Sequence, residues 1–325
     1  MNVLAAGLSY VDLNFLGVPR IIATVVLHGP GGVALIDPGP SSTLPALRAA
    51  LEQAGIAMAD LRAILLTHIH LDHAGATGTL VHQNPGLRVY VHEKGAPHLV
   101  APERLIASAT RLWGDEMDRL WGEFRPVPEH ALTILRGGER FTAGARDLDV
   151  AYTPGHASHH VSYYNADSGV AFVGDTAGIR RAERGFVLPP TPPPDIDLEL
   201  WRDSLARIGR WSPTTLFVTH FGPHAPAATH LTEMAENLDL TAGLARASLG
   251  REGTDLDREA WFTEEIRRAL RKRHGEAEAQ AYEVAGRFDL NWRGLARYWR
   301  KKAVGAASEG LAHAPTMERE PEDRD

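Results

Sequence analysis

The chain contains no cysteine among its 325 residues. Disulfide bonds and thiolate metal sites are therefore excluded, and any metal ion must be bound by histidine, aspartate or glutamate. Long apolar runs are also missing, since none approaches the roughly 18 residues that a transmembrane helix needs. The N-terminal stretch MNVLAAGLSYVDLNFLG lacks the positively charged segment that opens a secretory signal. We therefore expect a soluble, cytoplasmic protein with no membrane partner.

Concentrated positive charge is a third absence. The chain has 34 basic and 41 acidic residues, which gives a formal net charge of −7, and its core region has no concentrated basic stretch. Nucleic acid is therefore not an expected partner, and a small-molecule substrate is. The 44% hydrophobic and 23% charged residues are typical of a globular protein, and the length permits one or two domains.

Residues 1–225 alternate between strand-like and helix-like segments, which predicts an α/β domain. The predicted strands are rich in Val and Ile and are bounded by Gly or Pro; they include RIIATVVLHG, GGVALIDPG, LRAILLTH, LRVYVHE, LDVAYTPG, HHVSYYNAD, GVAFVGD and TTLFVTHFG. Two segments have helical spacing of apolar residues, STLPALRAALEQAG and DLELWRDSLARIGRWSP. Residues 226–305 show no strand signal and predict a helical C-terminal extension. Residues 306–325 lack core-forming side chains and predict a disordered tail.

Residues 95–125 interrupt the alternation as a mostly helical insertion. Apolar side chains recur along one face of it, at Leu112, Trp113, Met117, Leu120, Trp121 and Phe124. Such a stripe is most often the core face of a packed helix. Two tryptophans and a phenylalanine would also suit a lid over a binding site or the surface of a homodimer. The sequence leaves these alternatives open.

The stretch LLTHIHLDHAGATG, residues 65–78, places three histidines and an aspartate within six positions. Burying such polar groups is costly unless each finds a partner, and a metal ion would satisfy them together. On an extended backbone His68 and His70 point the same way and can approach one ion. Asp72 and His73 follow where the chain turns into a helix-like segment and would reach a second ion nearby. The stretch therefore predicts two adjacent metal ions.

Four ligands cannot complete two sites, so other segments must contribute. Three later polar residues stand at the ends of predicted strands beside small residues: His156 in YTPGHASHH, Asp175 in FVGDTAG and His220 in FVTHFGP. Strand ends along one edge of a sheet converge in space. We therefore expect these three side chains to join the cluster.

With these residues in place, the chain resembles the metallo-β-lactamase-fold hydrolase superfamily, in its glyoxalase II or lactonase-like branch. The resemblance covers roughly residues 20–222 and rests on the run His68-Ile69-His70-Leu71-Asp72-His73, on the three later residues, and on ALIDPG upstream. It implies a four-layer αββα sandwich, with residues 1–225 as the catalytic domain and the helical extension packed on it.

The resemblance also implies a role for each residue of the motif. Three histidines would bind the first ion: His68, His70 and His156. The second ion would be bound by Asp72, His73 and His220. Asp175 would bridge the two ions, and Asp37 would support the ligands from behind. Zinc is the metal most expected, although manganese and iron also suit histidine and carboxylate ligands.

Two metal ions about 3.5–4 Å apart can share a hydroxide and polarise a scissile group. We therefore expect a binuclear metal-dependent hydrolase acting on a small ester, lactone or thioester, with Asp72 or Asp175 as the catalytic group that moves the proton. A phosphodiesterase and a metal-bearing binding or regulatory protein without turnover are the alternatives. Similar β-lactamases usually have a cysteine where Asp175 stands, and similar lactonases often carry a tyrosine where Gly178 stands, so neither activity is favoured.

Substrate-pocket residues are indicated only weakly. Phe15 and Arg20 lie in NFLGVPRI, which precedes the first predicted strand pair, and His159 and His160 follow the expected ligand His156. The segment GFVLPPTPPPDIDLE is a rigid connection that could also form a pocket wall. The remaining histidines are expected to be surface or satisfied side chains: His28, His82, His92, His98, His130, His224, His230, His274 and His313.

Overall fold

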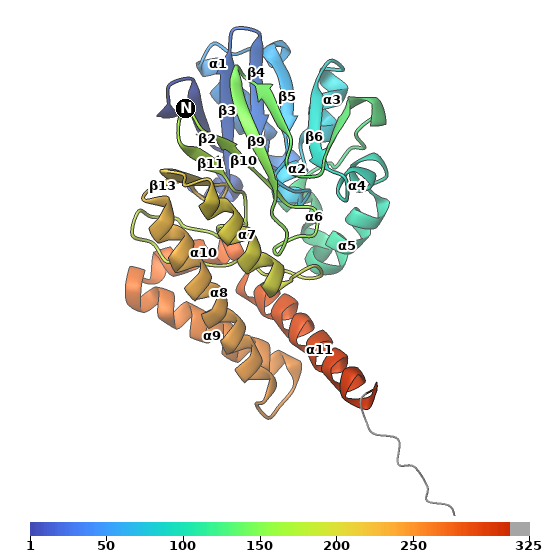
Figure 1. Ribbon diagram of the computed structural model, residues 1–325, viewed down its shortest axis with the longest axis vertical. Helices are drawn as coiled ribbons and strands as arrows, with labels where there is room; N and C mark the ends of the chain where they lie inside the picture. The colour runs from blue at the N-terminus through green and yellow to red at the C-terminus, as the bar shows by residue number, and fades with distance from the viewer. Residues whose placement is uncertain (313–325) are drawn as a thin grey trace, which may run out of the picture.

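Two β-sheets packed face to face form the upper part of the molecule (Figure 1), in a computed structural model that describes residues 1–312. The first sheet has seven strands in chain order: β1 (Asn2–Ala5), β2 (Leu8–Asp12), β3 (Ala23–Gly29), β4 (Gly32–Ile36), β5 (Leu61–Leu65), β6 (Arg88–His92) and β7 (Leu132–Leu135). Strands β1 to β4 pair antiparallel, and β4 to β7 pair parallel.

The second sheet has six strands whose spatial order runs backwards along the chain from β13 to β8. They are β8 (Arg140–Ala143), β9 (Arg146–Tyr152), β10 (Val161–Asn165), β11 (Val170–Phe172), β12 (Thr215–Val218) and β13 (Gly222–His224). Only β11 and β12 pair parallel. The predicted strands are present. The sequence patterns missed β1, β2, β7, β8 and β13, most of which have three or four residues and too few positions to show alternation.

Helices cover both outer faces of the sheet pair. Those of the first 225 residues are α1 (Leu44–Gln53), α2 (Leu71–Ala74), α3 (Thr77–Gln83), α4 (Ala96–Val100), α5 (Glu103–Trp113), α6 (Met117–Trp121) and α7 (Leu198–Arg210). Short 3₁₀ turns occur at Phe15–Gly17, Ser41–Thr43, Met58–Asp60, Gly114–Glu116 and Glu129–Ala131. The 95–125 insertion is thus three helices, interrupted at Pro102 and at Gly114, whose φ of 52° is strained for other residues.

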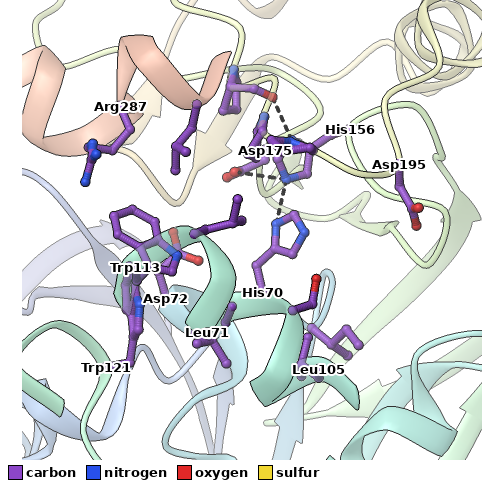
Figure 2. A pocket seen from close by; sticks show the side chains of 18 of the residues that line it. His70, Leu71, Asp72, Leu105, Trp113, Trp121, His156, Asp175, Asp195 and Arg287 are labelled. Atoms are coloured by element: carbon purple, nitrogen blue, oxygen red, sulfur yellow. Dashed lines mark hydrogen bonds and ion pairs between the residues drawn. The ribbon is translucent and has the colours of Figure 1, made fainter. Parts of the chain in front are cut away.

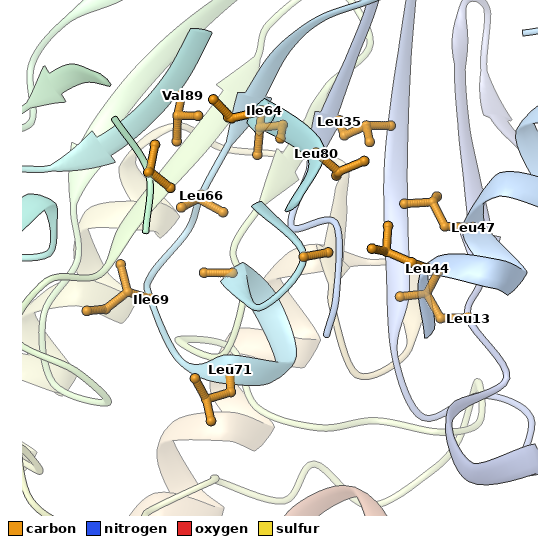
Figure 3. Close-up of a cluster of buried hydrophobic side chains, with 14 of the residues drawn as sticks. Leu13, Leu35, Leu44, Leu47, Ile64, Leu66, Ile69, Leu71, Leu80 and Val89 are labelled. Atoms are coloured by element: carbon orange, nitrogen blue, oxygen red, sulfur yellow. The ribbon is translucent and has the colours of Figure 1, made fainter. Parts of the chain in front are cut away.

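Side chains along each strand point alternately to the two faces of its sheet, so they contribute to different layers of the core. In β3, Val25 and Leu27 lie between the two sheets, whereas Val26 points outward beneath the helices. The outer cluster joins Leu35 and Ile64 of the sheet to Leu47 of α1 (Figure 3). On the far side, residues of β11 and β12 pack against α7 and α8. This helix–sheet–sheet–helix order is the predicted αββα sandwich.

The C-terminal region consists of α8 (Ala227–Leu249), α9 (Asp255–His274), α10 (Glu276–Gly286) and α11 (Phe288–Ala312), as predicted. It has its own apolar core, which includes Phe262, Tyr282 and Trp292 and also takes in Trp201 of α7. Helix α11 continues to Ala312, past residue 306 where the disordered tail was predicted to begin. The rest of that tail, 313–325, lies outside the described residues. Within residues 1–312, none of the helices combines the length and apolar character needed to cross a bilayer.

Candidate metal centre

Seven polar side chains meet at one end of the sandwich, each just after a strand or in the first turn of a short helix. His68 and His70 follow β5, and Asp72 and His73 lie in α2 directly beyond them. The other three follow different strands: His156 after β9, Asp175 after β11 and His220 after β12. All seven predicted ligands come together, but from the strand ends of both sheets and not, as predicted, from one edge of a single sheet.

Three histidines form the first group of this cluster. The Nδ1 atom of His70 lies 3.0 Å from Nε2 of His68 and 3.0 Å from Nε2 of His156. The ligand atoms of the three residues all lie within 4.8 Å of one another. This is the set expected for the first ion, and Figure 2 shows His70 and His156 turned toward each other.

The second group contains Asp72, His73 and His220, whose ligand atoms also lie within 4.8 Å of one another. The Oδ2 atom of Asp72 is 3.3 Å from Nε2 of His220 and 3.7 Å from Nε2 of His73. The Asp72 side chain keeps 23% of its surface exposed and lies on the wall of a cavity. This group is therefore open to solvent through its carboxylate.

Asp175 lies between the two groups with one carboxylate oxygen toward each. Its Oδ2 is 3.4 Å from Nε2 of His156, and its Oδ1 is 3.2 Å from Nε2 of His73 and 3.5 Å from that of His220. The side chain is only 5% exposed. A carboxylate in this position can ligate two ions at once, which is the arrangement expected of a bridging aspartate.

Hydrogen bonds outside the cluster fix the tautomers of three histidines. The Nδ1 atom of His156 donates to the carbonyl of Pro190 at 2.8 Å, and that of His220 donates to the carbonyl of Ile21 at 2.7 Å. A carbonyl oxygen only accepts, so the Nε2 atom of each neutral ring carries a lone pair. His73 is held in the same way, because its Nδ1 lies 2.8 Å from a carboxylate oxygen of Asp37. In their neutral forms, the three rings therefore turn lone pairs into the cluster, as a metal site requires.

Asp37 stands behind the cluster and organises it. Besides His73, its carboxylate accepts hydrogen bonds from the backbone N–H of Thr67 at 2.8 Å, from the Thr67 hydroxyl at 2.7 Å and from the Thr219 hydroxyl at 3.0 Å. These partners flank His68 and His220. The expected supporting position of Asp37 is thus occupied by a buried carboxylate that reaches both groups.

Two buried atoms test whether a metal ion suits this cluster. Nε2 of His73 and Oδ1 of Asp175 are buried and lie 3.2 Å apart, but neither makes an aligned hydrogen bond with any described residue. Orphaned buried polar atoms are destabilising, and an ion placed between them would satisfy both. Histidine nitrogens and carboxylate oxygens suit zinc, manganese or iron. The residues present therefore fit a divalent metal site.

The electrostatics of the cluster point the same way. Burial acts to lower the pKa of His73, but the carboxylates of Asp175, Asp72 and Asp37 outweigh it and hold the pKa well above the ordinary value. Burial acts to raise the pKa of Asp72, yet His73 and His220 lower it to about 2. The second group is therefore an environment that stabilises positive charge.

The first group is different, because it holds neutral imidazoles. Burial lowers the pKa of His68 well below the ordinary value, and burial together with His156 lowers that of His70 to about 4. Neutral rings at neutral pH are the form in which histidine ligates metal.

A cavity of about 320 Å³ opens onto the cluster. Its walls come from four parts of the chain: the segment around Phe15 and Ile21, the 95–125 insertion, the proline-rich segment at Pro190–Pro194, and residues 284–291 of α10 and α11. The proline-rich segment is thus a pocket wall as well as a connector. Figure 2 shows several of these lining side chains, among them His70, Asp72, Trp113 and Arg287.

Two of the four predicted substrate-pocket residues line the cavity, and two do not. Phe15 and His159 line the cavity. Arg20 does not: its side chain is exposed and lies over the ring of Phe221 at 5.6 Å. His160 is also outside the cavity wall, because its ring is fully buried, with Nδ1 3.0 Å from the Thr153 hydroxyl and Nε2 accepting from the backbone N–H of Asp175 at 3.3 Å. His160 therefore positions Asp175 instead of facing substrate.

Several lining residues were missed from the sequence. His98, which was expected to be an ordinary surface or satisfied side chain, lies on the cavity wall. So do Gly286, Arg287 and Asn291 at the junction of α10 and α11. No motif marks these positions, and only the folding of the helical region against the sandwich brings them to the site.

Comparisons of sequence agree with this geometry. The family described as the metallo-beta-lactamase superfamily matches residues 17–220. The metallo-beta-lactamase fold-containing protein ST1585 of Sulfurisphaera tokodaii is 30% identical over 234 residues, which cover 70% of this chain and 84% of that protein. A hydroxyacylglutathione hydrolase of Thermosynechococcus vestitus is 32% identical over 153 residues, which cover 46% of this chain and 47% of the enzyme. The chain therefore aligns with about half the length of that enzyme.

Comparisons of structure extend the likeness beyond the matched domain. The crystal structure of a metallo-beta-lactamase family protein of Thermus thermophilus, TTHA1429, superposes with a TM-score of 0.69 at 24% identity, covering 93% of this chain and 95% of that one. The crystal structure of archaeal ST1585 superposes with a TM-score of 0.62 at 25% identity, covering 89% and 98%. The fold of the helical region is thus included in these likenesses.

Proposed function

This chain belongs to the metallo-beta-lactamase superfamily and is a metal-dependent hydrolase, and we propose that it uses two divalent ions to hydrolyse a small ester, lactone or thioester. Zinc is the metal that we favour, with manganese or iron as alternatives that the same ligands would accept. The observation that carries the proposal is Asp175, whose two carboxylate oxygens face two separate groups of three ligands.

Bound ions would supply a hydroxide nucleophile at neutral pH and stabilise the negative charge that develops on the attacked carbonyl. The chain's own residues set the conditions for that attack. Asp72 reaches the cavity and is ionised at neutral pH, because His73 and His220 keep its pKa near 2 despite burial. We assign proton uptake and relay to its carboxylate, and a purely bridging role to the more deeply buried Asp175.

The character of the cavity separates the candidate reactions. Leu71, Leu105 and Trp113 lie among a largely aliphatic and aromatic lining, which excludes water from an attacked carbonyl and makes burial of a charged phosphodiester costly, although Lys94 and Arg104 also lie on the wall. A carbonyl substrate is therefore favoured over a phosphodiester. A binding or regulatory protein without turnover is disfavoured, because the predicted ligand set is complete and Asp72 remains open to the cavity.

Metal content is the first test. Elemental analysis of purified wild-type protein should give about two ions per chain. His68→Ala and His220→Ala should each reduce that number, because each removes a ligand from a different group. His82→Ala is the matched control, since His82 is exposed and its Nε2 contacts only the carbonyl of Pro126. One ion or none in the wild-type protein would contradict the binuclear site.

Turnover is the second test. A panel of simple esters, lactones and thioesters is compared with a bis-aryl phosphate, using wild-type protein and Asp72→Ala. We expect carbonyl substrates to be preferred, and Asp72→Ala to lose on the order of 10²- to 10⁴-fold in kcat, as removal of a general base usually does. A preference for the phosphate would favour the phosphodiesterase. A full metal complement with no turnover of any substrate would favour the binding protein.

A further inference from the structure

Three aromatic side chains form a continuous wall of the cavity: Phe15, Trp113 and Trp121, called here the aromatic wall. We propose that the substrate carries a flat apolar group beside its scissile bond and that this group packs against the aromatic wall. The inference rests on the proposed function, since it concerns the substrate of the same site. If it is correct, the enzyme prefers aryl-bearing or similarly flat substrates to substrates with short acyl groups.

The geometry of the wall is that of a packed aromatic cluster. The rings of Phe15 and Trp121 are stacked, with centroids 5.6 Å apart and planes 17° apart. Trp113 meets Trp121 edge to face, with centroids 5.0 Å apart and planes 78° apart. These are favourable arrangements for aromatic pairs. Phe15 and Trp121 are 4% and 7% exposed and belong to the outer core cluster, so the half-buried Trp113 presents most of the ring surface to the cavity.

The wall lies close to the candidate metal centre. Trp113 and Trp121 line the same cavity as Leu71, Asp72, His70 and Asp175, and Figure 2 shows all six in one view. Leu71 and Asp72 are consecutive, so one turn of α2 contributes both a ligand and an apolar contact to the cavity. A substrate whose carbonyl approaches the ions would thus place the neighbouring group against the wall.

The helical C-terminal region fixes the outermost ring of the wall. The guanidinium of Arg287 lies 4.9 Å from the ring centroid of Trp113, in a cation–π arrangement. The same guanidinium is paired with Asp289, with N–O distances of 3.0 and 2.9 Å. Arg287 is therefore committed to these two partners and holds Trp113 in place, so we do not assign it to a substrate anion.

Size and polarity agree with a flat apolar group. An apolar cavity of about 150 Å³ is enough to hold benzene, and this cavity has about 320 Å³. An acetyl group would leave much of that space to poorly bonded water. A strongly polar group would leave its own donors and acceptors unpaired against the rings, which is unfavourable. An aryl or comparable group fills the space without either penalty.

The test compares matched thioesters. Phenylacetyl and acetyl thioesters of N-acetylcysteamine place the flat group on the acyl side, and S-benzyl thioacetate places it on the leaving-group side. Each kcat/KM is divided by the rate of the uncatalysed alkaline reaction. We expect at least one phenyl-bearing substrate to exceed the acetyl thioester roughly tenfold or more, since even one methylene in an apolar pocket is worth about 10- to 200-fold. Equal values for all three would overturn the inference.

Variants then assign the preference to the wall. Trp113→Ala should reduce the phenyl-to-acetyl ratio about tenfold, whereas Trp113→Phe should retain most of it. Phe15→Leu, which keeps volume but removes a flat face, gives a second reading if Trp113→Ala does not fold. The matched control is Trp211→Ala, because Trp211 is also partly buried but stacks on Tyr164 at the outer face of the other sheet. A ratio that Trp113→Ala and Phe15→Leu leave unchanged, at normal metal content, would overturn the inference.

A binding measurement separates this inference from the proposed function. Phenylacetate and acetate are titrated against the metal-loaded protein and followed by intrinsic tryptophan fluorescence, which needs no turnover. Tighter binding of phenylacetate, weakened by Trp113→Ala, would support the wall even if no thioester, ester or lactone were hydrolysed and the proposed function failed. Equal binding of the two acids would overturn the inference that the aromatic wall binds a flat group, even if hydrolysis were observed.

Discussion

The β-sandwich and the helical C-terminal region contribute to one cavity in different ways. The sandwich supplies every predicted ligand, from the ends of β5, β9, β11 and β12 and from α2. Residues 284–291 of the helical region supply part of the wall, and Arg287 holds Trp113 from that side. The first 225 residues therefore carry both the ligands and the aromatic wall, whereas the helical region closes part of the cavity and contacts Trp113 through Arg287.

The two regions also differ in how they are held. Behind the ligands, polar groups bond to one another, as when Asp37 accepts from Thr67, Thr219 and His73. The helical region packs mainly around an apolar core, with isolated polar ties such as the indole N–H of Trp292 to the Ser248 hydroxyl at 2.7 Å. We therefore expect substitutions in the first region to alter metal binding, and substitutions in the second to alter stability and substrate binding.

Among these substitutions, we expect the largest effect, a loss of metal affinity, from a change at Asp37. Asp37→Asn keeps the shape but replaces one carboxylate oxygen by an amide N–H, which cannot accept from His73, Thr67 or Thr219. Asparagine tolerates the left-handed backbone found here, with φ at 51°, so the backbone is not disturbed. We expect metal affinity to fall about 10- to 100-fold, as for other residues that orient metal ligands. Competition against a chelator measures this.

Asp147→Asn is the control for that substitution. Asp147 also accepts from a threonine hydroxyl, that of Thr142 at 2.7 Å, but it lies at the start of β9, away from the ligands. Unchanged metal affinity in Asp37→Asn would mean that the buried carboxylate stabilises the fold alone, and the polar support assigned to the sandwich would be wrong.

The residue patterns predicted an α/β domain and the convergence of the ligands for an identifiable reason, whereas the αββα sandwich was implied by the resemblance to the superfamily. His68, His70, Asp72 and His73 are adjacent in the chain, and the other ligands each follow a strand whose apolar residues mark it clearly. The strand ends were expected to meet along the edge of one sheet, but β5 belongs to the first sheet and β9, β11 and β12 to the second, so the ligands meet where the two sheets end together. Asp37 was predicted from the resemblance alone, and the structure places it directly after β4.

The cavity could not be predicted in the same way. Arg20 was placed in it because it is near Phe15 in the chain, but the backbone reverses there: Asp12 accepts from the N–H groups of Asn14 and Arg20, and the Arg20 side chain turns to Phe221. His160 and His159 are neighbours that point to opposite sides, one behind Asp175 and one into the cavity. Gly286 reaches the site only through packing between distant helices. Such placements depend on tertiary contacts that leave no local pattern.

Arg181 connects the two regions, so its substitution tests whether the helical region also influences metal binding. Its guanidinium pairs with Glu278 of α10 at 3.0 Å and also donates to the carbonyls of Pro19 and Arg20. The next carbonyl, that of Ile21, orients His220. Arg181→Gln should destabilise the protein by about 1–3 kcal/mol, because a mostly buried pair loses one partner while the other stays partly solvated. Urea unfolding measures this, and metal content is measured in parallel.

Arg267→Gln is the matched variant, because Arg267 of α9 pairs with Glu283, which is also in α10, but the pair stays within the helical region. If both variants keep two ions, the ligands are supported by the sandwich alone, and the helical region contributes to stability but not to metal binding. If only Arg181→Gln loses metal, the helical region also supports His220 through residues 19–21, and the comparison breaks at this point.

The smallest effect is expected at His230 in α8, on the seam between the regions. Its Nε2 donates to the carbonyl of Ala177 at 2.8 Å, and its Nδ1 faces the guanidinium of Arg180 at 3.5 Å, so the ring is held neutral.

Burial, with help from His224 and Arg180, lowers the pKa of His230 to about 3. Because the unfolded state then binds the proton first, this contribution to stability is present above pH 6.5 and is lost as the pH falls. Between pH 7.5 and 5.5 the wild type should lose about 1.4 kcal/mol more than His230→Gln, whereas the exposed control His82→Gln should lose as much as the wild type. Equal losses in wild type and His230→Gln, by urea unfolding, would show that the seam admits a charged His230.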